Sequence, residues 1–217
     1  MAPFLSPTAA NFHAMSSAPT NILLLRHGQS EWNADGRWQG LADPPLSHLG
    51  RRQAIIAVKH LGTVDYIVSS DLRRAAETAE ILANGVGIGP VIFDVRLRER
   101  DAGEWTGLTR NDIAAKWPGA MERGDRPPGF EPDESVLPRV LAAIVATHRR
   151  VPGGDVVLVA HGGVVRAMER HLGAEEGLLP NLGGRWIIVR SEAEIYLGDR
   201  VVLISEEEVA VTLPNHL

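Results

Sequence analysis

The stretch Ile22-Leu23-Leu24-Leu25-Arg26-His27-Gly28 joins an unbroken apolar run to an arginine, a histidine and a glycine. A short apolar run without alternation is typical of a strand that is buried on both faces of a sheet. In an open parallel sheet, ligands bind beyond the carboxyl ends of the strands. The stretch therefore indicates a central strand that delivers Arg26, His27 and Gly28 to the functional edge of the sheet.

Outward from this stretch, short β-branched runs alternate with segments of helical spacing. We predict strands at Ile22–Arg26, Tyr66–Ser70, Val91–Asp94, Val156–His161, Arg185–Val189 and Val201–Ser205. We predict helices at Leu72–Ala83, stopped by Asn84-Gly85, at Leu137–His148, and at Val164–Leu172, stopped by Gly173. The alternation predicts an α/β fold, a three-layer αβα sandwich with a mostly parallel central sheet and helices on both faces. Pro118–Pro132, with four prolines and three glycines, is predicted to be a surface loop.

Composition limits the class of protein. The chain has 217 residues, of which 44% are hydrophobic and 23% charged, as in an ordinary globular domain. A net charge of −5 and a pI near 5.9 argue against nucleic-acid and anionic-membrane partners. The absence of cysteine excludes disulfides, thiolate metal sites and a cysteine nucleophile. Residues 1–20 lack the positive start and apolar run of a secretory signal. We expect a disordered or loosely ordered tail at 1–20, a single domain at 21–217 and a cytoplasmic protein.

Polar residues follow three of the predicted strands. The first ends in Arg26-His27-Gly28, the second in Ser69-Ser70-Asp71 with Arg73-Arg74 close behind, and the fourth in His161-Gly162-Gly163. Each motif alone is weak evidence, but the fold brings all three to one edge. Arginines offer planar forks to phosphate oxygens, and glycines let backbone amides approach closely, so the edge predicts a phosphoryl site. A metal site is disfavoured, because the histidines lack Asp or Cys at ligand spacing and the arginines would repel a cation.

Taken together, these residues resemble the histidine phosphatase family, also called the phosphoglycerate mutase-like family. The resemblance runs from Asn21 to the terminal His216-Leu217. It is carried by Leu24–Asn33 (LLRHGQSEWN), Gly36–Gly40 (GRWQG), Pro45-Leu46-Ser47 with Gly50, Ser69–Ala75 (SSDLRRA) with Thr78-Ala79, Leu97-Arg98-Glu99 with Gly103–Leu108, and Ala160–Gly163 (AHGG) with Arg166. As an ordered set these motifs are highly specific.

The resemblance implies a role for each matching residue. His27 would attack phosphorus and become a phosphohistidine, which water then hydrolyses. Arg26, Arg74 (rather than Arg73) and a protonated His161 would hold the phosphoryl oxygens. Asn33, Gln39 and Gly162 would line the same pocket. Because His161 is followed by Gly162 and not by Asp, the proton donor would be Glu99. No metal or other cofactor is implied.

Three functions are compatible with these motifs. The first is a phosphatase that acts on a small phosphorylated metabolite, with Arg37, Trp38 and the Pro118–Pro132 loop setting specificity. The second is a phosphoglycerate mutase, because Glu122–Pro128 faintly resembles the mutase lid. The third is a non-catalytic phospho-ligand binder, which the presence of the nucleophile and the acid argues against. The short interval between Glu99 and His161 favours access of water to the site, and therefore the phosphatase.

Overall fold

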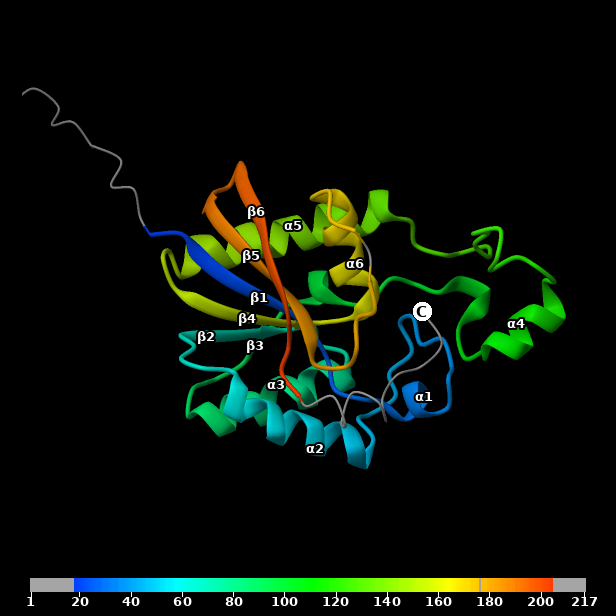
Figure 1. Cartoon of the computed structure of the whole chain (residues 1–217), viewed down its shortest axis with the longest axis horizontal. Coiled ribbons are helices and arrows are strands. Elements are labelled where there is room, and N and C mark those ends of the chain that lie inside the picture. Colours follow the sequence, from blue (N-terminus) through cyan, green and yellow to red (C-terminus); the bar gives the residue numbers. More distant parts are fainter. Residues whose placement is uncertain (1–17, 176, 205–217) are drawn as a thin grey trace, which may run out of the picture.

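Six strands form one sheet in the order β3-β2-β4-β1-β5-β6 (Figure 1), in a computed structural model that describes residues 18–175 and 177–204. The strands are β1 (Thr20–Arg26), β2 (Tyr66–Ser69), β3 (Ile92–Phe93), β4 (Asp155–Ala160), β5 (Gly183–Ser191) and β6 (Glu194–Val202). The first four run parallel to one another, while β5 is antiparallel to β1 and β6 to β5. The prediction of a mostly parallel sheet is confirmed.

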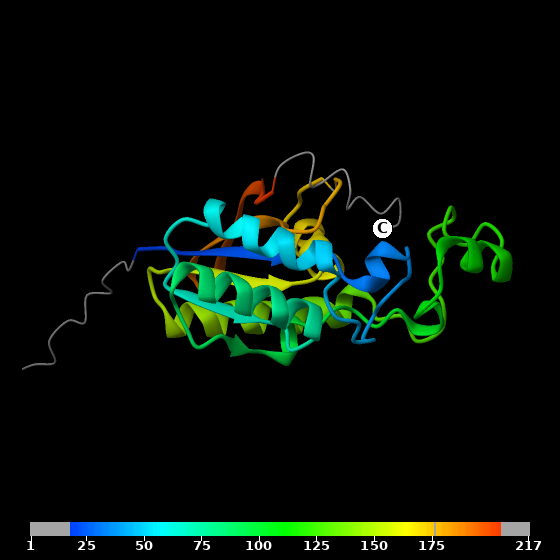
Figure 2. The same cartoon turned by 90° about the horizontal axis from the view of Figure 1, so that it is seen from below.

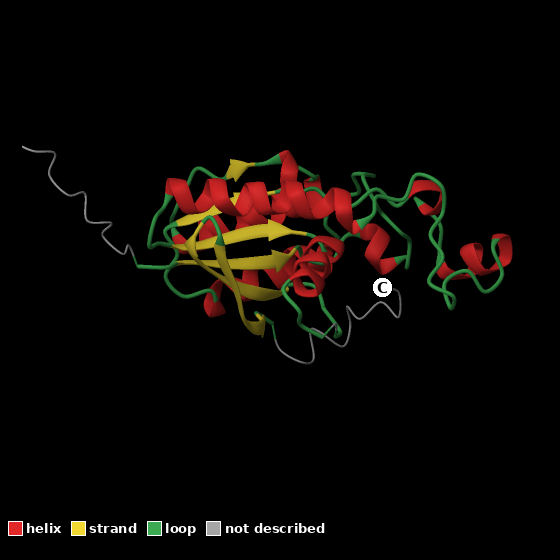
Figure 3. Ribbon diagram, turned by 90° about the horizontal axis from the view of Figure 1, so that it is seen from above, coloured by secondary structure: helices red, strands yellow, loops and turns green. Residues whose placement is uncertain are grey.

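Helices cover both faces of this sheet, as Figures 2 and 3 show from opposite sides. They are α1 (Glu31–Ala34), α2 (His48–Ala57), α3 (Arg73–Val86), α4 (Arg110–Lys116), α5 (Asp133–Arg150) and α6 (Gly162–His171). Ile22 and Leu24 of β1 pack with α5 and α6, whereas Leu23 and Leu25 pack with α2 and α3. Successive side chains of a strand point to opposite faces, so a strand covered on both sides is apolar throughout. The predicted three-layer sandwich is confirmed.

Helix α3 continues past its predicted stop. Asn84 and Gly85 lie inside the helix, which ends where Gly87 adopts a left-handed conformation with φ of 73°. The reason for Gly85 is close packing, because a Cβ there would lie 2.4 Å from a methyl carbon of Val58. Helices α5 and α6 extend slightly beyond their predicted starts, and α1, α2 and α4 were not predicted. In α2, polar and glycine residues obscure the apolar period.

The sixth strand was misplaced. Val201–Ser205 was predicted as a strand, but β6 runs from Glu194 to Val202, and Leu203 leaves it to donate its backbone N–H to the carbonyl oxygen of Leu182. β6 is an edge strand whose charged residues hide the apolar pattern. Ser205 lies outside the described residues.

The carboxyl ends of the central strands lie on the side of the molecule that carries α1 and α4 (Figures 1 and 3). The predicted Pro118–Pro132 loop is confirmed, since it contains turns but no helix or strand apart from a bridge between Phe130 and Ala102. β1 begins at the buried Thr20, inside the segment predicted as a tail, and residues 1–17 lie outside the described part. Within the described ranges, no helix has the length and apolar character needed to cross a bilayer.

Candidate active site

Two histidines face each other where β1 and β4 end. The strands pair in parallel with Arg26 opposite Ala160, so each strand is followed by a histidine. The ring centroids of His27 and His161 lie 5.1 Å apart, with their planes at 64°. His27 is 3% exposed and His161 is fully buried. The structure therefore brings together two residues that are 134 positions apart in the sequence (161 − 27).

The hydrogen bond of His27 leaves one ring nitrogen available. Its Nδ1 lies 2.6 Å from the carbonyl oxygen of Gly28. A carbonyl oxygen can only accept a hydrogen bond, so Nδ1 carries the proton and donates it, and Nε2 keeps its lone pair. Burial, followed by the charges of Arg74 and Arg26, lowers the pKa of His27 well below its ordinary value of 6.5. The imidazole is therefore neutral at neutral pH and nucleophilic at Nε2.

Distant segments hold the backbone around His27. The N–H of Gly28 donates to Thr78 Oγ1 at 3.1 Å, and Asn181 Nδ2 donates to the carbonyl oxygen of His27 at 2.9 Å. Gly28 has no space for a side chain, because a Cβ would lie 2.7 Å from the carbonyl oxygen of Gly50. The sequence reading missed Asn181, since nothing local marks it as a neighbour of β1.

Two buried guanidinium groups flank His27. Arg26 is 2% exposed and donates to the carbonyl oxygen of Leu179, while the fully buried Arg74 donates to the carbonyl oxygens of Gly40 and Ala42. Arg74 Nε is buried and has no partner among the described residues. Burial is the main cause that lowers the pKa of Arg26 to about 9 and that of Arg74 to about 10, so both remain charged at neutral pH. Together they form a positive field with N–H donors still to satisfy.

Glu99 lies across the pocket and is held by backbone amides. Its Oε1 accepts the N–H of Arg100 at 2.8 Å, and its Oε2 accepts the N–H of Gly163 at 3.0 Å. Gly163 packs tightly against the carboxylate, because a Cβ there would lie 2.4 Å from Glu99 Oε1 and would force that side chain to shift. The second glycine after His161 therefore makes room for the carboxylate. Both carboxyl oxygens of Glu99 accept hydrogen bonds from backbone N–H groups, so its orientation in the pocket is fixed.

His161 differs from the expectation in its charge. Its Nε2 lies 2.9 Å from Ser70 Oγ, and its buried Nδ1 has no partner among the described residues. Burial is the main cause that lowers the pKa of His161 well below 6.5, and the charge of Arg74 acts in the same direction. The expected protonated His161 is therefore corrected to a neutral ring. A neutral imidazole still carries one N–H donor.

Most of the predicted residues, including Arg26, His27, Arg74 and Glu99, line a cavity of about 190 Å³, whereas His161 is not part of its lining. Asn33, Gln39 and Gly162 all line it. Asn33 Oδ1 accepts the backbone N–H of Ser30, and Gln39 Oε1 accepts the hydroxyl of the same serine, which fixes both side chains. Arg73 is exposed, and its Nη2 lies 3.8 Å from Oε1 of Glu77. Arg74 lines the pocket and Arg73 does not.

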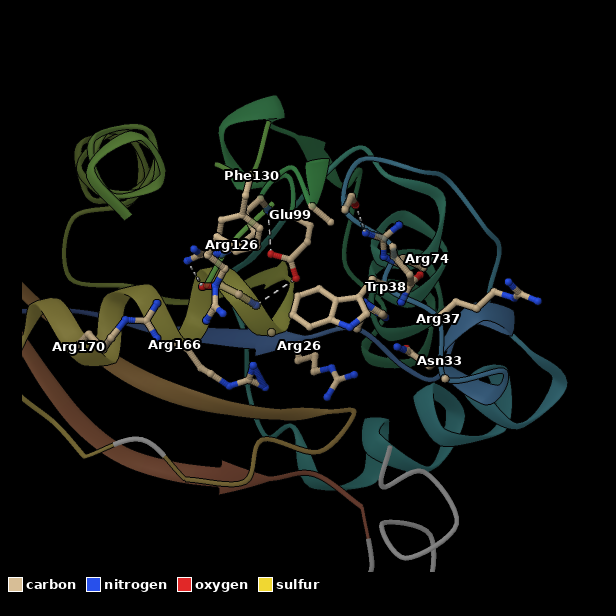
Figure 4. A pocket seen from close by; sticks show the side chains of 18 residues that line it. Arg26, Asn33, Arg37, Trp38, Arg74, Glu99, Arg126, Phe130, Arg166 and Arg170 are labelled. Atoms are coloured by element: carbon tan, nitrogen blue, oxygen red, sulfur yellow. Dashed lines mark hydrogen bonds between the residues drawn. The ribbon is translucent and has the colours of Figure 1, made fainter. Parts of the chain in front are cut away.

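The sequence reading missed part of the pocket wall (Figure 4). Arg37 and Trp38 were expected to contribute and do line it, but Arg100, Arg126, Phe130 and Arg170 were not foreseen individually. Arg166 and Arg170 are four residues apart in α6, a spacing that places both on one helix face and could have been recognised. Among the described residues, Glu99 is the one acidic residue of the lining, which contains seven arginines: Arg26, Arg37, Arg74, Arg100, Arg126, Arg166 and Arg170. In a chain with a net charge of −5, this is a strong local preference for anions.

Within residues 18–175 and 177–204, no group of three or more His, Cys, Asp or Glu side chains is placed to hold a metal ion. The arrangement that the structure does present is a neutral nucleophile between two guanidinium groups, with a carboxylate opposite. Such a site can accept a phosphoryl group and transfer a proton beside it.

Comparisons with known proteins agree with this geometry. The sequence model of the histidine phosphatase superfamily (branch 1) matches residues 22–183. The glucosyl-3-phosphoglycerate phosphatase of Mycolicibacterium vanbaalenii is 42% identical over 178 residues, covering 75% of this chain and 79% of that protein. The 2,3-bisphosphoglycerate-dependent phosphoglycerate mutase of Methylobacterium radiotolerans is 33% identical over 200 residues, covering 84% of this chain and 94% of that protein.

A solved structure shares both the fold and the sequence pattern. The mycobacterial glucosyl-3-phosphoglycerate phosphatase in complex with VO3 superposes with a TM-score of 0.71 and 35% identity, covering 82% of this chain and 96% of that one. The family match spans both strand-end histidines, His27 and His161, together with Arg74 and Glu99. This chain therefore belongs to the histidine phosphatase superfamily.

Proposed function

We propose that the chain is a phosphatase that hydrolyses a phosphomonoester through a phosphohistidine on His27, with Glu99 as the proton donor. One observation carries the proposal: the neutral His27 ring has its Nδ1 committed to Gly28 and its Nε2 lone pair free, between the buried Arg26 and Arg74. In-line attack on phosphorus needs this lone pair, and the charge that develops on the phosphoryl oxygens needs the guanidinium groups.

In the first half-reaction, His27 Nε2 forms a bond to phosphorus while the bond from phosphorus to the alcohol oxygen breaks. The leaving alkoxide is strongly basic and takes a proton from Glu99. Glu99 takes up this proton as the substrate binds and so enters the step in its protonated form. Arg26, Arg74 and the N–H of His161 hold the three transferring oxygens.

In the second half-reaction, water replaces the alcohol. Glu99, now a carboxylate, accepts a proton from the water as its oxygen bonds to phosphorus, and the bond from phosphorus to Nε2 breaks. Inorganic phosphate leaves and neutral His27 is restored. The two amide hydrogen bonds to Glu99 suit this step, because they keep the carboxylate oriented between turnovers.

For the substrate, we propose a small phosphorylated metabolite that carries a second anionic group. Arg126 supports this proposal. Its guanidinium donates to the carbonyl oxygens of Gly124 and Asp125 and stacks on Phe130, 5.2 Å from the ring centroid. Because it pairs with no carboxylate among the described residues, it can pair with an anionic group of the substrate. Glucosyl-3-phosphoglycerate, the substrate in the name of the 42% identical relative, combines a phosphate ester with a glycerate carboxylate. Such a highly charged ester does not diffuse through membranes, and we propose a cytoplasmic location with it.

A phosphoglycerate mutase is the second candidate. Two observations favour it. The Methylobacterium radiotolerans relative is named a phosphoglycerate mutase, and Arg126 of the mutase-like segment 122–128 lines the pocket. The two functions differ in the fate of the phosphohistidine, which a mutase returns to a phosphoglycerate and a phosphatase passes to water.

The test is to measure both fates in one experiment. The purified chain is incubated with glucosyl-3-phosphoglycerate, 3-phosphoglycerate and simple alkyl phosphates, with inorganic phosphate and 2-phosphoglycerate quantified together. We expect phosphate release that survives EDTA and is blocked by vanadate, which mimics the transition state. Interconversion of the phosphoglycerates with little phosphate release would establish the mutase. Activity that EDTA removes and a divalent metal restores would refute the metal-independent mechanism.

A further inference from the structure

The hydroxyl of Ser70 is the hydrogen-bonding partner of His161. Ser70 follows β2, is fully buried, and places Oγ 2.9 Å from His161 Nε2. The same Oγ accepts the backbone N–H of Leu72 at 3.3 Å, at the start of α3. The neighbouring Ser69 is equally buried but turns away, because its hydroxyl donates to the carbonyl oxygen of Ser70 at 2.8 Å.

The two neutral tautomers of His161 differ in how many buried hydrogen-bonding groups of His161 and Ser70 lack a partner among the described residues. If Nε2 carried the proton, Nε2 would donate to Ser70 Oγ, and both the Ser70 hydroxyl proton and the Nδ1 lone pair would be buried without partners among the described residues. If Nδ1 carries it, Ser70 donates to Nε2 and accepts from Leu72, and one buried donor, Nδ1–H, is left over. Buried polar groups without partners are costly, so the second arrangement is favoured.

The leftover donor belongs to a ring that lies beside the nucleophile, although His161 itself is not part of the cavity lining. The ring of His161 lies against that of His27, and Arg74 carries a second buried donor, Nε, with no partner among the described residues. Each lacks an acceptor that a phosphoryl group would provide. The neutral His161 therefore contributes an N–H to the site without becoming a cation.

We propose that Ser70 is a positioning residue that fixes His161 in the Nδ1–H tautomer, so that the neutral ring donates a hydrogen bond to the transferring phosphoryl group. The proposal rests on the proposed function for its kinetic consequence, but the tautomer itself is a property of the protein without substrate. It also explains how His161 can act as a donor while its ring is neutral.

The charged surroundings of His161 keep this tautomer relevant at neutral pH. Arg74 of α3, Arg26 of β1 and Arg139 of α5 all oppose a positive charge on the ring, as does the neighbouring His27 when protonated. Burial acts in the same direction. A ring that stays neutral has one N–H group. The nitrogen that carries this proton determines whether the ring offers the phosphoryl group a hydrogen-bond donor or a lone pair.

The direct test is nitrogen-15 NMR of the wild-type protein with labelled histidine, with His161→Gln used to assign the His161 signals. Long-range proton–nitrogen correlations distinguish a protonated ring nitrogen from one that bears a lone pair. We expect Nδ1 protonated and Nε2 unprotonated in His161 at neutral pH. A protonated Nε2 with a bare Nδ1, or a doubly protonated ring, would overturn the proposal. Because this measurement needs no turnover, its failure is distinct from failure of the phosphatase proposal.

A kinetic test compares Ser70→Ala with the matched control Ser69→Ala. Without the Ser70 hydroxyl, His161 can place its proton on either nitrogen, so we expect kcat to fall roughly tenfold with little change in KM. Ser69→Ala removes an equally buried hydroxyl from the neighbouring position, the last residue of β2, and should retain wild-type kcat and the wild-type His161 spectrum. If both variants lose the same activity, or if Ser70→Ala leaves the His161 spectrum unchanged, Ser70 does not set the tautomer. Should Ser70→Ala fail to fold, the wild-type spectrum still decides.

Discussion

Two regions of the pocket are built in opposite ways. The strand-end cluster (Arg26, His27, Arg74 and His161) is at most 3% exposed, and the groups that hold it are largely backbone carbonyl oxygens. The loop wall (Arg37, Trp38, Arg126 and Phe130) is partly or fully exposed and comes from segments without regular structure. In the loop wall, arginine rests on aromatic rings and on carbonyl oxygens of its own loop.

The contrast separates chemistry from selection of the substrate. Buried donors with fixed partners cannot reorganise during the reaction, which is what stabilisation of a transition state requires. Exposed arginines on a loop can meet different anions at little cost to the fold. Changes in the strand-end cluster should therefore lower kcat for every substrate, and changes in the loop wall should alter KM for some substrates.

The largest expected effect tests the strand-end side of this comparison. His27→Ala removes the nucleophile, so turnover should fall by about 10⁴-fold or more. The wild-type enzyme, quenched during turnover and digested without acid, should carry phosphate on His27 by mass spectrometry. The exposed His60→Ala is the matched control and should behave as wild type. Substantial turnover by His27→Ala would remove His27 from the mechanism.

Next in size is the loss of the proton donor. Glu99→Gln should slow the hydrolysis of alkyl phosphates by roughly 10²-fold while sparing nitrophenyl phosphate, whose leaving group departs without a proton. The comparison is made where phosphorylation of His27 limits the rate. Glu80→Gln, an exposed carboxyl in α3 that does not line the pocket, is the control. Equal losses on both substrates would make Glu99 structural and direct attention to Asp101 or Glu104 as the acid.

A smaller effect should follow from disturbing Glu99 through its neighbour. In Gly163→Ala the new Cβ would lie 2.4 Å from Glu99 Oε1 and 2.9 Å from Arg100 Nε, so the carboxylate must move. We expect about a tenfold loss on alkyl phosphates and a smaller loss on nitrophenyl phosphate, the same selectivity as Glu99→Gln. The midpoint of thermal unfolding, measured for the variant and the wild type, shows whether lost activity comes from a displaced Glu99 or from an unfolded protein. A uniform loss on both substrates would show that Gly163 does not act through Glu99.

The fold and the strand-end cluster could be predicted for the same reason. The apolar runs of β1 and β4 are continuous because both sheet faces are covered, and the residues after each run must lie at one edge. Helix ends were less predictable, since Gly85 serves packing against Val58 and not a turn. The edge strand β6 was missed over most of its length, because Gly198, Asp199 and Arg200 separate its apolar stretches Ile195–Leu197 and Val201-Val202.

The loop wall and the protonation states were not predictable from local pattern. Arg126 and Phe130 reach the pocket through the path of an irregular loop, which no periodicity encodes. Asn181 contacts the backbone of His27 across 154 positions. The family resemblance implied a protonated His161, yet burial of the ring and the charges of the nearby arginines oppose its protonation. Charge depends on three-dimensional burial, which the sequence motif does not contain.

This charge difference gives a prediction that sharpens the comparison. Burial is the main cause that lowers the pKa of His27 and of His161 well below 6.5, so neither ring should titrate between about pH 6 and 7 in an NMR titration. Unfolded chains bind protons on both rings below about pH 6.5 and the folded protein does not, so the free energy of unfolding should decrease as the pH falls from 6.5. Above that pH the two histidines are neutral in both the folded and the unfolded chain, so they no longer make the free energy of unfolding depend on pH. A midpoint near 6.5 for either buried histidine would contradict the proposed neutral pair.

The smallest expected effect tests the loop wall itself. In Arg126→Ala the pocket loses an exposed guanidinium that stacks on Phe130 and lies outside the strand-end cluster. For a substrate with a carboxylate beside its phosphate, KM should rise severalfold with kcat nearly unchanged, because the interaction is equally strong in the bound substrate and in the transition state. A simple alkyl phosphate should show no change. The matched control is Arg123→Ala on the same loop, whose guanidinium pairs with Asp125 and does not line the pocket. If Arg126→Ala instead lowers kcat for all substrates, the loop wall takes part in the chemistry, and the division between the two regions fails.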